Sequence, residues 1–190
     1  MKAYFTASLR GKQDYEINYR AIVEGLGKLG YKVFAGHILN VNAATKAASQ
    51  TNEEKKEFYK ELLGWVKAAD IVVAEISYPS VSVGHEISFA LELGKVVLVL
   101  HTKDNSSILL EGSDDKRLMM VCYSLDNLYK ILPKAVEDAR QASDVRFNFF
   151  VSPKILAYLD WVAKKRMIPR SVFLRDLIEK EMKKDKKFRE

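Results

Sequence analysis

Short apolar runs rich in valine, isoleucine and alanine recur along the first two thirds of the chain, and longer amphipathic stretches separate them. Such short runs predict strands buried on both faces, while the stretches between them predict helices that cross from one strand to the next. This alternation is typical of a parallel sheet with helical crossovers. We expect strands at residues 3–7, 32–35, 71–76, 96–100 and 118–123, and helices at residues 14–29, 52–68, 84–93 and 126–141.

The ends of the expected helices carry suitable signals. Thr51 with Glu54 can form a capping box, and Gly30 and Gly94 follow the ends of two helices. The sequence thus predicts an α/β domain with a five-stranded, parallel, doubly wound sheet of the flavodoxin or Rossmann-like kind. A sheet of this type binds ligands in the loops at the C-terminal ends of its strands. The loops to consider are residues 8–13, 36–40, 77–84 and 101–116.

The chain of 190 residues is long enough for one core of ordinary size and a small appendage. It contains no run approaching the ~18 apolar residues of a membrane span, and its N-terminus lacks a basic flank followed by an apolar core. We therefore expect a cytoplasmic protein. The single cysteine, Cys122, excludes an intrachain disulfide and a thiol metal cluster, and its apolar surroundings favour a place in the core.

Residues 141–144 are small and polar, so we expect a linker between a domain of residues 1–142 and a separate module of residues 145–190. From Arg146 onward the chain carries 13 basic and 6 acidic side chains, which more than accounts for the net charge of +6. Such a charge suits an anionic partner such as nucleic acid. A lysine-rich helix end that complements the helix dipole is the simpler explanation of the charge alone.

The tail also changes its pattern. Residues 146–152 alternate like a strand, and two amphipathic helices follow, one from Pro153 and one after a break at 168–171. A strand and two short helices cannot bury this much apolar surface by themselves. We therefore expect the module to dimerise.

The loop after the third expected strand, residues 77–86, holds the most informative constellation. Here the Ser80 hydroxyl and free N–H groups at a helix start can bind a phosphate. Gly84 would let the backbone bend tightly, so that Glu86, in the first turn of the helix, faces what the loop binds. An acidic residue in a first turn is also ordinary dipole complementarity, and the spacing alone leaves the two interpretations about even.

The loop after the first strand adds Ser8-Leu9-Arg10-Gly11. An arginine can bind phosphate through a forked pair of hydrogen bonds, and a glycine permits close approach of the backbone. Taken together, the segments resemble the nucleoside 2-deoxyribosyltransferase superfamily, and most closely its deoxynucleoside 5′-monophosphate N-glycosidase branch, over residues 3–140. The resemblance is carried by Tyr4 to Gly11, by His37, by Trp65 before the run 69–75, and by the block 79–86.

The resemblance implies a retaining N-glycosyl transfer. Glu86 would attack the anomeric carbon, expel the base and form a covalent glycosyl ester, which water or a second base then resolves. Tyr4 would position or polarise Glu86, Ser107 would reach the phosphate across a dimer, and no metal or organic cofactor would take part. The substrate-binding residues that the resemblance implies are Ser8, Leu9, Arg10, Gly11, His37, Ser80, Gly84 and Ser107.

The chain departs from the family pattern at three places. Leu62 stands where the family has an aspartate that serves the departing base, and without it the base leaves less readily. Glu61 is adjacent, but one helical residue turns a side chain by about 100°, which makes it a poor substitute. Ala7 and Ser82 stand where the family has glycines, and both changes reshape the pocket.

The tail resembles the ribbon-helix-helix family of DNA-binding dimers over residues 146–182. In that family, strands of two chains pair in the major groove and read bases with outward side chains. Phe150 occupies a reading position that is usually polar, so DNA binding competes evenly with a dimerisation module packed on the enzyme domain. The residues that the resemblance implies at the DNA are Arg146 and Asn148 at bases and Arg170 at a phosphate.

The leading hypothesis is an N-glycosidase or deoxyribosyltransferase that acts on (deoxy)nucleosides or their 5′-monophosphates and is dimeric or larger. The alternative is a nucleotide-sensing transcriptional regulator of the ribbon-helix-helix type with an inactive glycosidase-like domain. The enzyme would lose turnover on Glu86→Gln substitution, whereas the regulator would bind DNA in a salt-dependent way that Arg146→Ala weakens.

Overall fold

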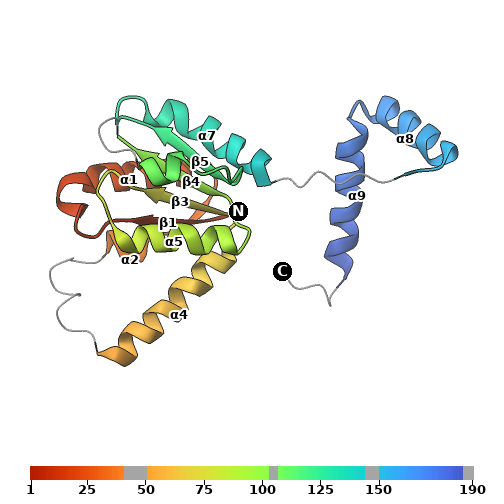
Figure 1. The fold of residues 1–190 in the computed structure, drawn as a ribbon. Helices are drawn as coiled ribbons and strands as arrows, with labels where there is room; N and C mark the ends of the chain where they lie inside the picture. Colours follow the sequence, from red (N-terminus) through yellow and green to blue (C-terminus); the bar gives the residue numbers. More distant parts are fainter. Residues whose placement is uncertain (41–50, 103–106, 144–149, 186–190) are drawn as a thin grey trace. The chain divides into compact units, whose positions relative to one another are not determined.

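The computed structural model describes residues 1–40, 51–102, 107–143 and 150–185 (Figure 1). The chain divides into two compact units, Met1–Val145 and Arg146–Glu190. Within the described ranges, none of the helices is both long and apolar enough to span a membrane.

A five-stranded sheet forms the centre of the first unit, and every pair of neighbouring strands is parallel. The order β2-β1-β3-β4-β5 places β3 in the centre between β1 and β4, with β2 and β5 at the edges. The predicted parallel α/β sheet is therefore confirmed, and each strand end lies within one residue of its predicted position. The strands are β1 (Lys2–Ala7), β2 (Lys32–Phe34), β3 (Ile71–Glu75), β4 (Val97–His101) and β5 (Leu118–Cys122).

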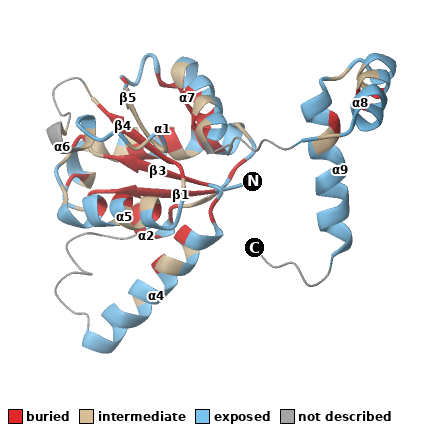
Figure 2. Cartoon of the chain, turned by 45° about the vertical axis from the view of Figure 1, so that its right-hand side comes forward, coloured by how far each residue is buried: buried red, intermediate tan, exposed pale blue. Residues whose placement is uncertain are grey.

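Helices cover both faces of this sheet, as Figure 2 shows by the buried strands between half-exposed helices. Successive residues of a strand point to opposite faces. Phe5 accordingly packs in one core with Ile22 and Leu132, while Tyr4 packs in a second core with Val66 and Ile87. The helices of this unit are α1 (Lys12–Lys28), α2 (Gly36–Leu39), α4 (Asn52–Ala68), α5 (Val81–Glu92), α6 (Ile108–Glu111) and α7 (Leu128–Ser143).

The start of α5 differs from the prediction in a way that matters for the site. The Ser80 hydroxyl accepts a hydrogen bond from the Val83 backbone N–H at 3.4 Å and so caps the helix, which begins at Val81 rather than at Gly84. Glu86 therefore lies in the second turn, not the first. Gly84 lies inside the helix, and a Cβ placed there would meet nothing within 4 Å, so the expected tight bend at this glycine was wrong.

Three other local expectations were also wrong. Residues 36–40, expected as a loop, begin with the short helix α2. Helix α7 continues to Ser143, so most of the expected linker at 141–144 is helical. Cys122 is exposed rather than packed in the core, because it ends β5, which is an edge strand of the sheet.

The second unit contains two helices, α8 (Pro153–Arg166) and α9 (Arg170–Lys184). Ser152 caps α8 by accepting the Ile155 N–H, and Met167 ends it in a left-handed conformation with φ of 53°. Most of the expected strand at 146–152, including Arg146 and Asn148, lies outside the described residues, and the described part, 150–152, forms no strand. The structure therefore describes two helices of this module and no ribbon.

Candidate active site

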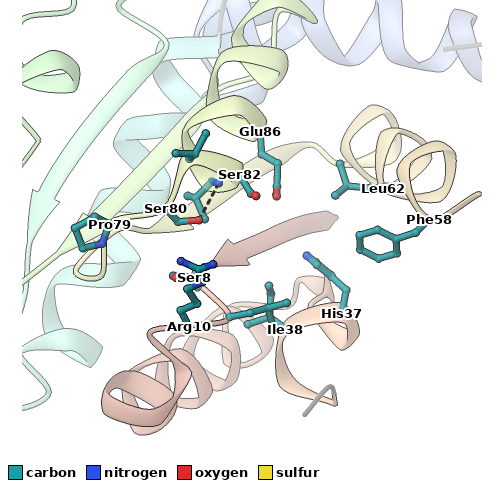
Figure 3. A pocket seen from close by; sticks show the side chains of 14 residues that line it. Ser8, Arg10, His37, Ile38, Phe58, Leu62, Pro79, Ser80, Ser82 and Glu86 are labelled. Carbon is teal, nitrogen blue, oxygen red and sulfur yellow. Dashed lines mark hydrogen bonds between the residues drawn. The ribbon is translucent and has the colours of Figure 1, made fainter. Parts of the chain in front are cut away.

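A cavity of about 610 Å³ opens at the C-terminal end of β1, between the loops that follow β1 and β3 and the helices α2 and α4. Figure 3 shows its two unlike ends: Arg10, Ser8 and Ser80 lie at one end, and Phe58 and Leu62 at the other. Its lining residues are Ala7, Ser8, Leu9, Arg10, His37, Ile38, Phe58, Leu62, Pro79, Ser80, Val81, Ser82, Val83 and Glu86.

Glu86 lies between these two ends, and Tyr4 holds its carboxylate. Val83 and Ile87 anchor this part of α5 in the core, which leaves the partly buried Glu86 side chain facing the cavity. Tyr4 is a fully buried residue of β1, and its hydroxyl donates a hydrogen bond to Glu86 Oε2 at 2.8 Å. Sheet and helix thus fix the orientation of the carboxylate together.

His37 completes a short chain of hydrogen bonds to this carboxylate. Its Nε2 atom lies 3.0 Å from the Tyr4 hydroxyl. Because Tyr4 gives its one proton to Glu86, it accepts the hydrogen bond from His37, which assigns the hydrogen of the imidazole to Nε2. The imidazole stacks parallel to the Tyr4 ring at 5.2 Å between centroids, with the Trp65 ring at 5.3 Å. The short helix α2 therefore presents a histidine of fixed orientation.

The electrostatics of this chain favour a tyrosine that donates a hydrogen bond to the glutamate. Burial, and then the charge of Glu86, raises the pKa of Tyr4, so that the phenol keeps its proton. Burial raises the pKa of Glu86, while the nearby hydroxyls of Thr6 and Tyr4 oppose that rise. The two hydroxyls thus support the carboxylate form, which is the form that can act as a nucleophile.

The end of the cavity at Arg10 has the features of an anion site. It combines the Arg10 guanidinium, the Ser8 and Ser80 hydroxyls and the N-terminus of α5, where the first backbone N–H groups of a helix point outward. The Gly11 N–H donates to the Ser8 hydroxyl at 3.3 Å. A Cβ on Gly11 would lie 2.3 Å from the Cβ of Tyr78, so this glycine is needed for the packing of the loop rather than for the approach of a ligand.

The remaining end is apolar. Phe58 and Leu62 lie one turn apart on α4, so both point into the cavity, and Ile38 of α2 faces it too. Glu61 lines a separate hollow beside Trp65. Within the described part of the cavity wall, Glu86 is therefore the single carboxylate.

The structure brings most of the sequence-predicted site residues together and leaves some apart. Ser8, Leu9, Arg10, His37, Ser80 and Glu86 line the cavity, and Tyr4 contacts two of them. Gly11, Gly84 and Ser107 do not line it. Arg146 and Asn148 lie outside the described residues, and Arg170 forms an ion pair with Asp160 of α8.

Sequence reasoning missed the contributions of Ile38 and Phe58 to the cavity. The spacing of Phe58 four residues before Leu62 was the signal available for one of them, because two such side chains share a helix face. The sequence holds no comparable signal for Ile38, which depends on the four-residue helix α2.

A second buried carboxyl, Glu75, lies at the end of β3 and has no exposed surface. The Ser77 N–H and hydroxyl and the Tyr123 hydroxyl donate to its Oε1 atom, and Tyr123 accepts from Asn18 at 3.0 Å. Burial raises the pKa of Glu75. These bonds tie β3 to the neighbouring segments on the sheet face opposite Tyr4, so Glu75 supports the loop that carries Ser80 without facing the cavity.

No cluster of three or more potential metal ligands of the His, Cys, Asp or Glu type occurs among the residues described.

Comparison with known proteins extends this picture. The family model described as nucleoside 2-deoxyribosyltransferase matches residues 3–140. A Thermofilum pendens protein, named as a proposed 2′-deoxynucleoside 5′-phosphate N-hydrolase, is 28% identical over 145 residues, covering 72% of this chain and 99% of its own. The 5-hydroxymethyl-dUMP N-hydrolase of Mus musculus is 28% identical over 138 residues, covering 70% of this chain and 79% of its own. The solved structure of the Clostridium botulinum CMP N-glycosidase BcmB aligns with a TM-score of 0.49 and 17% identity, over 70% of this chain and 98% of its own.

Proposed function

Because the chain belongs to the nucleoside 2-deoxyribosyltransferase family, we propose that it is an N-glycosidase of 2′-deoxynucleoside 5′-monophosphates. The names of the two relatives state this class of substrate for those proteins. The cavity supports the same assignment here, since a cationic end with two hydroxyls suits a 5′-phosphate and an apolar end suits a base.

The observation that carries the proposal is the hydrogen bond of 2.8 Å from Tyr4 to Glu86 midway between these ends. A nucleotide with its phosphate at Arg10 and its base at Phe58 has its sugar at Glu86. The carboxylate is then beside the anomeric carbon, where a nucleophile of a retaining glycosidase acts.

In the proposed reaction, a Glu86 oxygen forms a bond to the anomeric carbon while the bond from that carbon to the base breaks. The electron pair of the broken bond leaves with the base. Water then attacks the glycosyl ester, the sugar phosphate is released, and the Glu86 carboxylate is restored, while the proton of the water is available to the departed base. Tyr4 holds the Oε2 atom of this carboxylate by a hydrogen bond, and the attacking atom of the proposed step is Oε1.

The test is the release of free base from each common nucleoside and nucleoside 5′-monophosphate, in deoxy and ribo forms. We expect release from at least one deoxynucleoside 5′-monophosphate, and we expect Glu86→Gln to reduce it by about 1,000-fold or more because the nucleophile is lost. Glu92→Gln is the matched control, since Glu92 is an exposed carboxylate on the same helix. Undiminished turnover by the Glu86→Gln chain would refute the proposed mechanism.

For the second unit, we propose association with a second copy of the chain. Its buried core consists of Leu159, Val162 and Phe173, which is small for an independent fold. Meanwhile Tyr158 and Trp161 are each 55% exposed. Large exposed aromatic side chains beside so small a core favour burial against the same surface of a second copy. Ser107 does not line the cavity of its own chain, so a role at the phosphate would require delivery from such a partner.

Sedimentation equilibrium at several concentrations tests this association. The full chain should be dimeric or larger, and Trp161→Glu should shift it towards monomer by placing a charge in the contact. Lys154→Glu, at an exposed position of the same helix, should leave the association unchanged. A wild-type chain that stays monomeric at all concentrations contradicts the proposal.

A further inference from the structure

Another hollow adjoins the cavity at Glu86. It has a volume of about 420 Å³ and is lined by residues of helices α4 and α5. Phe58, Leu62 and Glu86 line both this hollow and the cavity. The proposed function places the base at Phe58 and Leu62, so the space for the base continues into the hollow between the two helices.

One face of each helix forms this hollow. Side chains that lie three, four and seven residues apart share a face of a helix. Helix α4 contributes four side chains at this spacing, from Lys55 to Leu62, and α5 contributes four at the same spacing, from Ser82 to Phe89. Glu86 is one of the four from α5, so the face that carries the nucleophile of the proposed reaction also lines the hollow.

The hollow adds proton-bearing side chains to the apolar end of the cavity. Lys55 and Tyr59 of α4 and His85 of α5 line the hollow without lining the cavity. Each of these side chains can donate a hydrogen bond. A base that leaves with the electron pair of the broken bond becomes an anion unless it receives a proton, and an anion is costly to form beside apolar side chains alone. A donor in the hollow would remove that cost.

His85 is the best placed of the three donors. Its side chain is exposed, so a bound base can reach it. The charge of His85 opposes the rise in the pKa of Glu86, so the two side chains lie near each other and His85 lies near the bond that breaks. Imidazole is also the side chain that most often transfers protons in enzymes.

We propose that the hollow between α4 and α5 receives the leaving base and that His85 is the catalytic residue that protonates it. This inference rests on the proposed function, which places the sugar at Glu86. The rings of Phe58 and Tyr59 suit the flat face of a base, since aromatic rings stack. Ordinary neutral bases fit this assignment, because each offers a ring nitrogen or a carbonyl oxygen that can accept a proton.

The proton balances over the two steps of the reaction. In the first step a Glu86 oxygen bonds to the anomeric carbon, the bond to the base breaks, and the base takes its electron pair and a proton from the His85 imidazolium. In the second step water attacks the same carbon, the bond to Glu86 breaks, and the His85 imidazole takes a proton from the water. The base leaves as a neutral molecule, and both side chains return to their starting forms.

The experiment measures kcat/KM of the full chain for two substrates that differ in their need for a proton. One is the ordinary deoxynucleoside 5′-monophosphate that the wild type cleaves best, and the other is 7-methyl-dGMP, whose cationic base leaves as a neutral molecule without a proton. His85→Ala should lower kcat/KM by about 100-fold or more for the first and by less than about 10-fold for the second, because general acid catalysis helps only the neutral base. Ser88→Ala, at an exposed position of the same helix outside the hollow, should change neither value.

A structural role of His85 predicts equal losses for the two substrates. Equal losses, or an undiminished kcat/KM for the ordinary nucleotide, would overturn this inference and leave the proposed function standing. Tyr59→Phe and Lys55→Met test the other two donors, and a loss confined to the ordinary nucleotide in one of them but absent in His85→Ala would overturn the role of His85. Release of base from none of the nucleotides, or release unaffected by Glu86→Gln, would overturn the proposed function and with it this inference.

Discussion

Removal of the Tyr4 hydroxyl should move the acid limb of the pH–activity profile to higher pH. Burial raises the pKa of Glu86, and the hydrogen bond from Tyr4 opposes that rise. Tyr4→Phe removes this hydrogen bond, so the pKa of Glu86 rises further. The Glu86 carboxylate is then protonated at a pH where the wild-type carboxylate is still ionised. Activity that needs the carboxylate is then lost at a higher pH.

The size of the shift follows from the geometry. A hydrogen bond of 2.8 Å to an ionised acceptor in a partly buried site is worth about 1.5–3 kcal/mol. Since one pKa unit corresponds to about 1.4 kcal/mol, the acid limb should move by roughly one to two pH units. The aromatic ring is retained, so the packing of Tyr4 in the core changes little.

The assay is kcat/KM for base release, measured across the pH range for wild type and Tyr4→Phe. Tyr123→Phe is the matched control, because it removes a hydroxyl that donates to a different buried carboxyl, Glu75, on the other face of the sheet. The control should keep the wild-type limb. A folded Tyr4→Phe chain whose limb is unmoved, or has moved to lower pH, would refute the reasoning.

Three further outcomes are expected. Arg10→Ala should raise KM for a 5′-monophosphate by about 10- to 100-fold, because charged hydrogen bonds to the phosphate are lost, and should leave KM for the nucleoside unchanged. An equal rise in KM for both substrates would contradict the proposal that the phosphate binds at Arg10. In thermal melts Gly11→Ala should destabilise the fold by roughly 1–3 kcal/mol because its Cβ meets Tyr78 at 2.3 Å, whereas Gly84→Ala, with open space around its Cβ, should stabilise by about 0.5–1 kcal/mol. Burial raises the pKa of Glu75, so the folded chain keeps this proton at a pH where the unfolded chain has lost it. The free energy of unfolding therefore falls as the pH rises from the ordinary glutamate pKa through the raised pKa. In urea melts over this pH range, Glu75→Gln should show a smaller fall in the free energy of unfolding than the wild type.

The fold was predictable where the sheet is buried on both faces. The central strand β3 is buried along its whole length, so its apolar run from Ile71 to Ala74 indicates a strand, and only its last residue, Glu75, is charged. Helix α4 was equally clear, because the Thr51 and Glu54 capping box fixes its first residue. The four-residue helices α2 and α6 are too short to show a period, and no pattern could indicate them.

The errors have local physical causes. Helix α5 begins three residues before Gly84 because Ser80, rather than the glycine, sets its start. Cys122 lies in an apolar run but at the end of an edge strand, and a run by itself does not tell an edge from a centre.

The candidate site was predictable in its centre and less so in its walls. The loop at 77–86 pointed to Glu86, and the resemblance added its role and that of Tyr4. The structure joins the two residues by a hydrogen bond across 82 residues of sequence. The reason for Gly11 could not be foreseen, because Tyr78 approaches it from a distant loop. Contacts of this kind depend on packing between segments and leave no periodic trace in the sequence.

The stereochemistry of the product tests the central claim most directly. In mixtures of water and methanol, the proposed glycosyl ester on Glu86 would be attacked by methanol as well as by water, and two successive inversions at the anomeric carbon restore its original configuration. NMR of the product should therefore show the methyl glycoside 5′-phosphate with the configuration of the substrate. A methyl glycoside of inverted configuration would contradict the account, because methanol would then have displaced the base without an intermediate on Glu86.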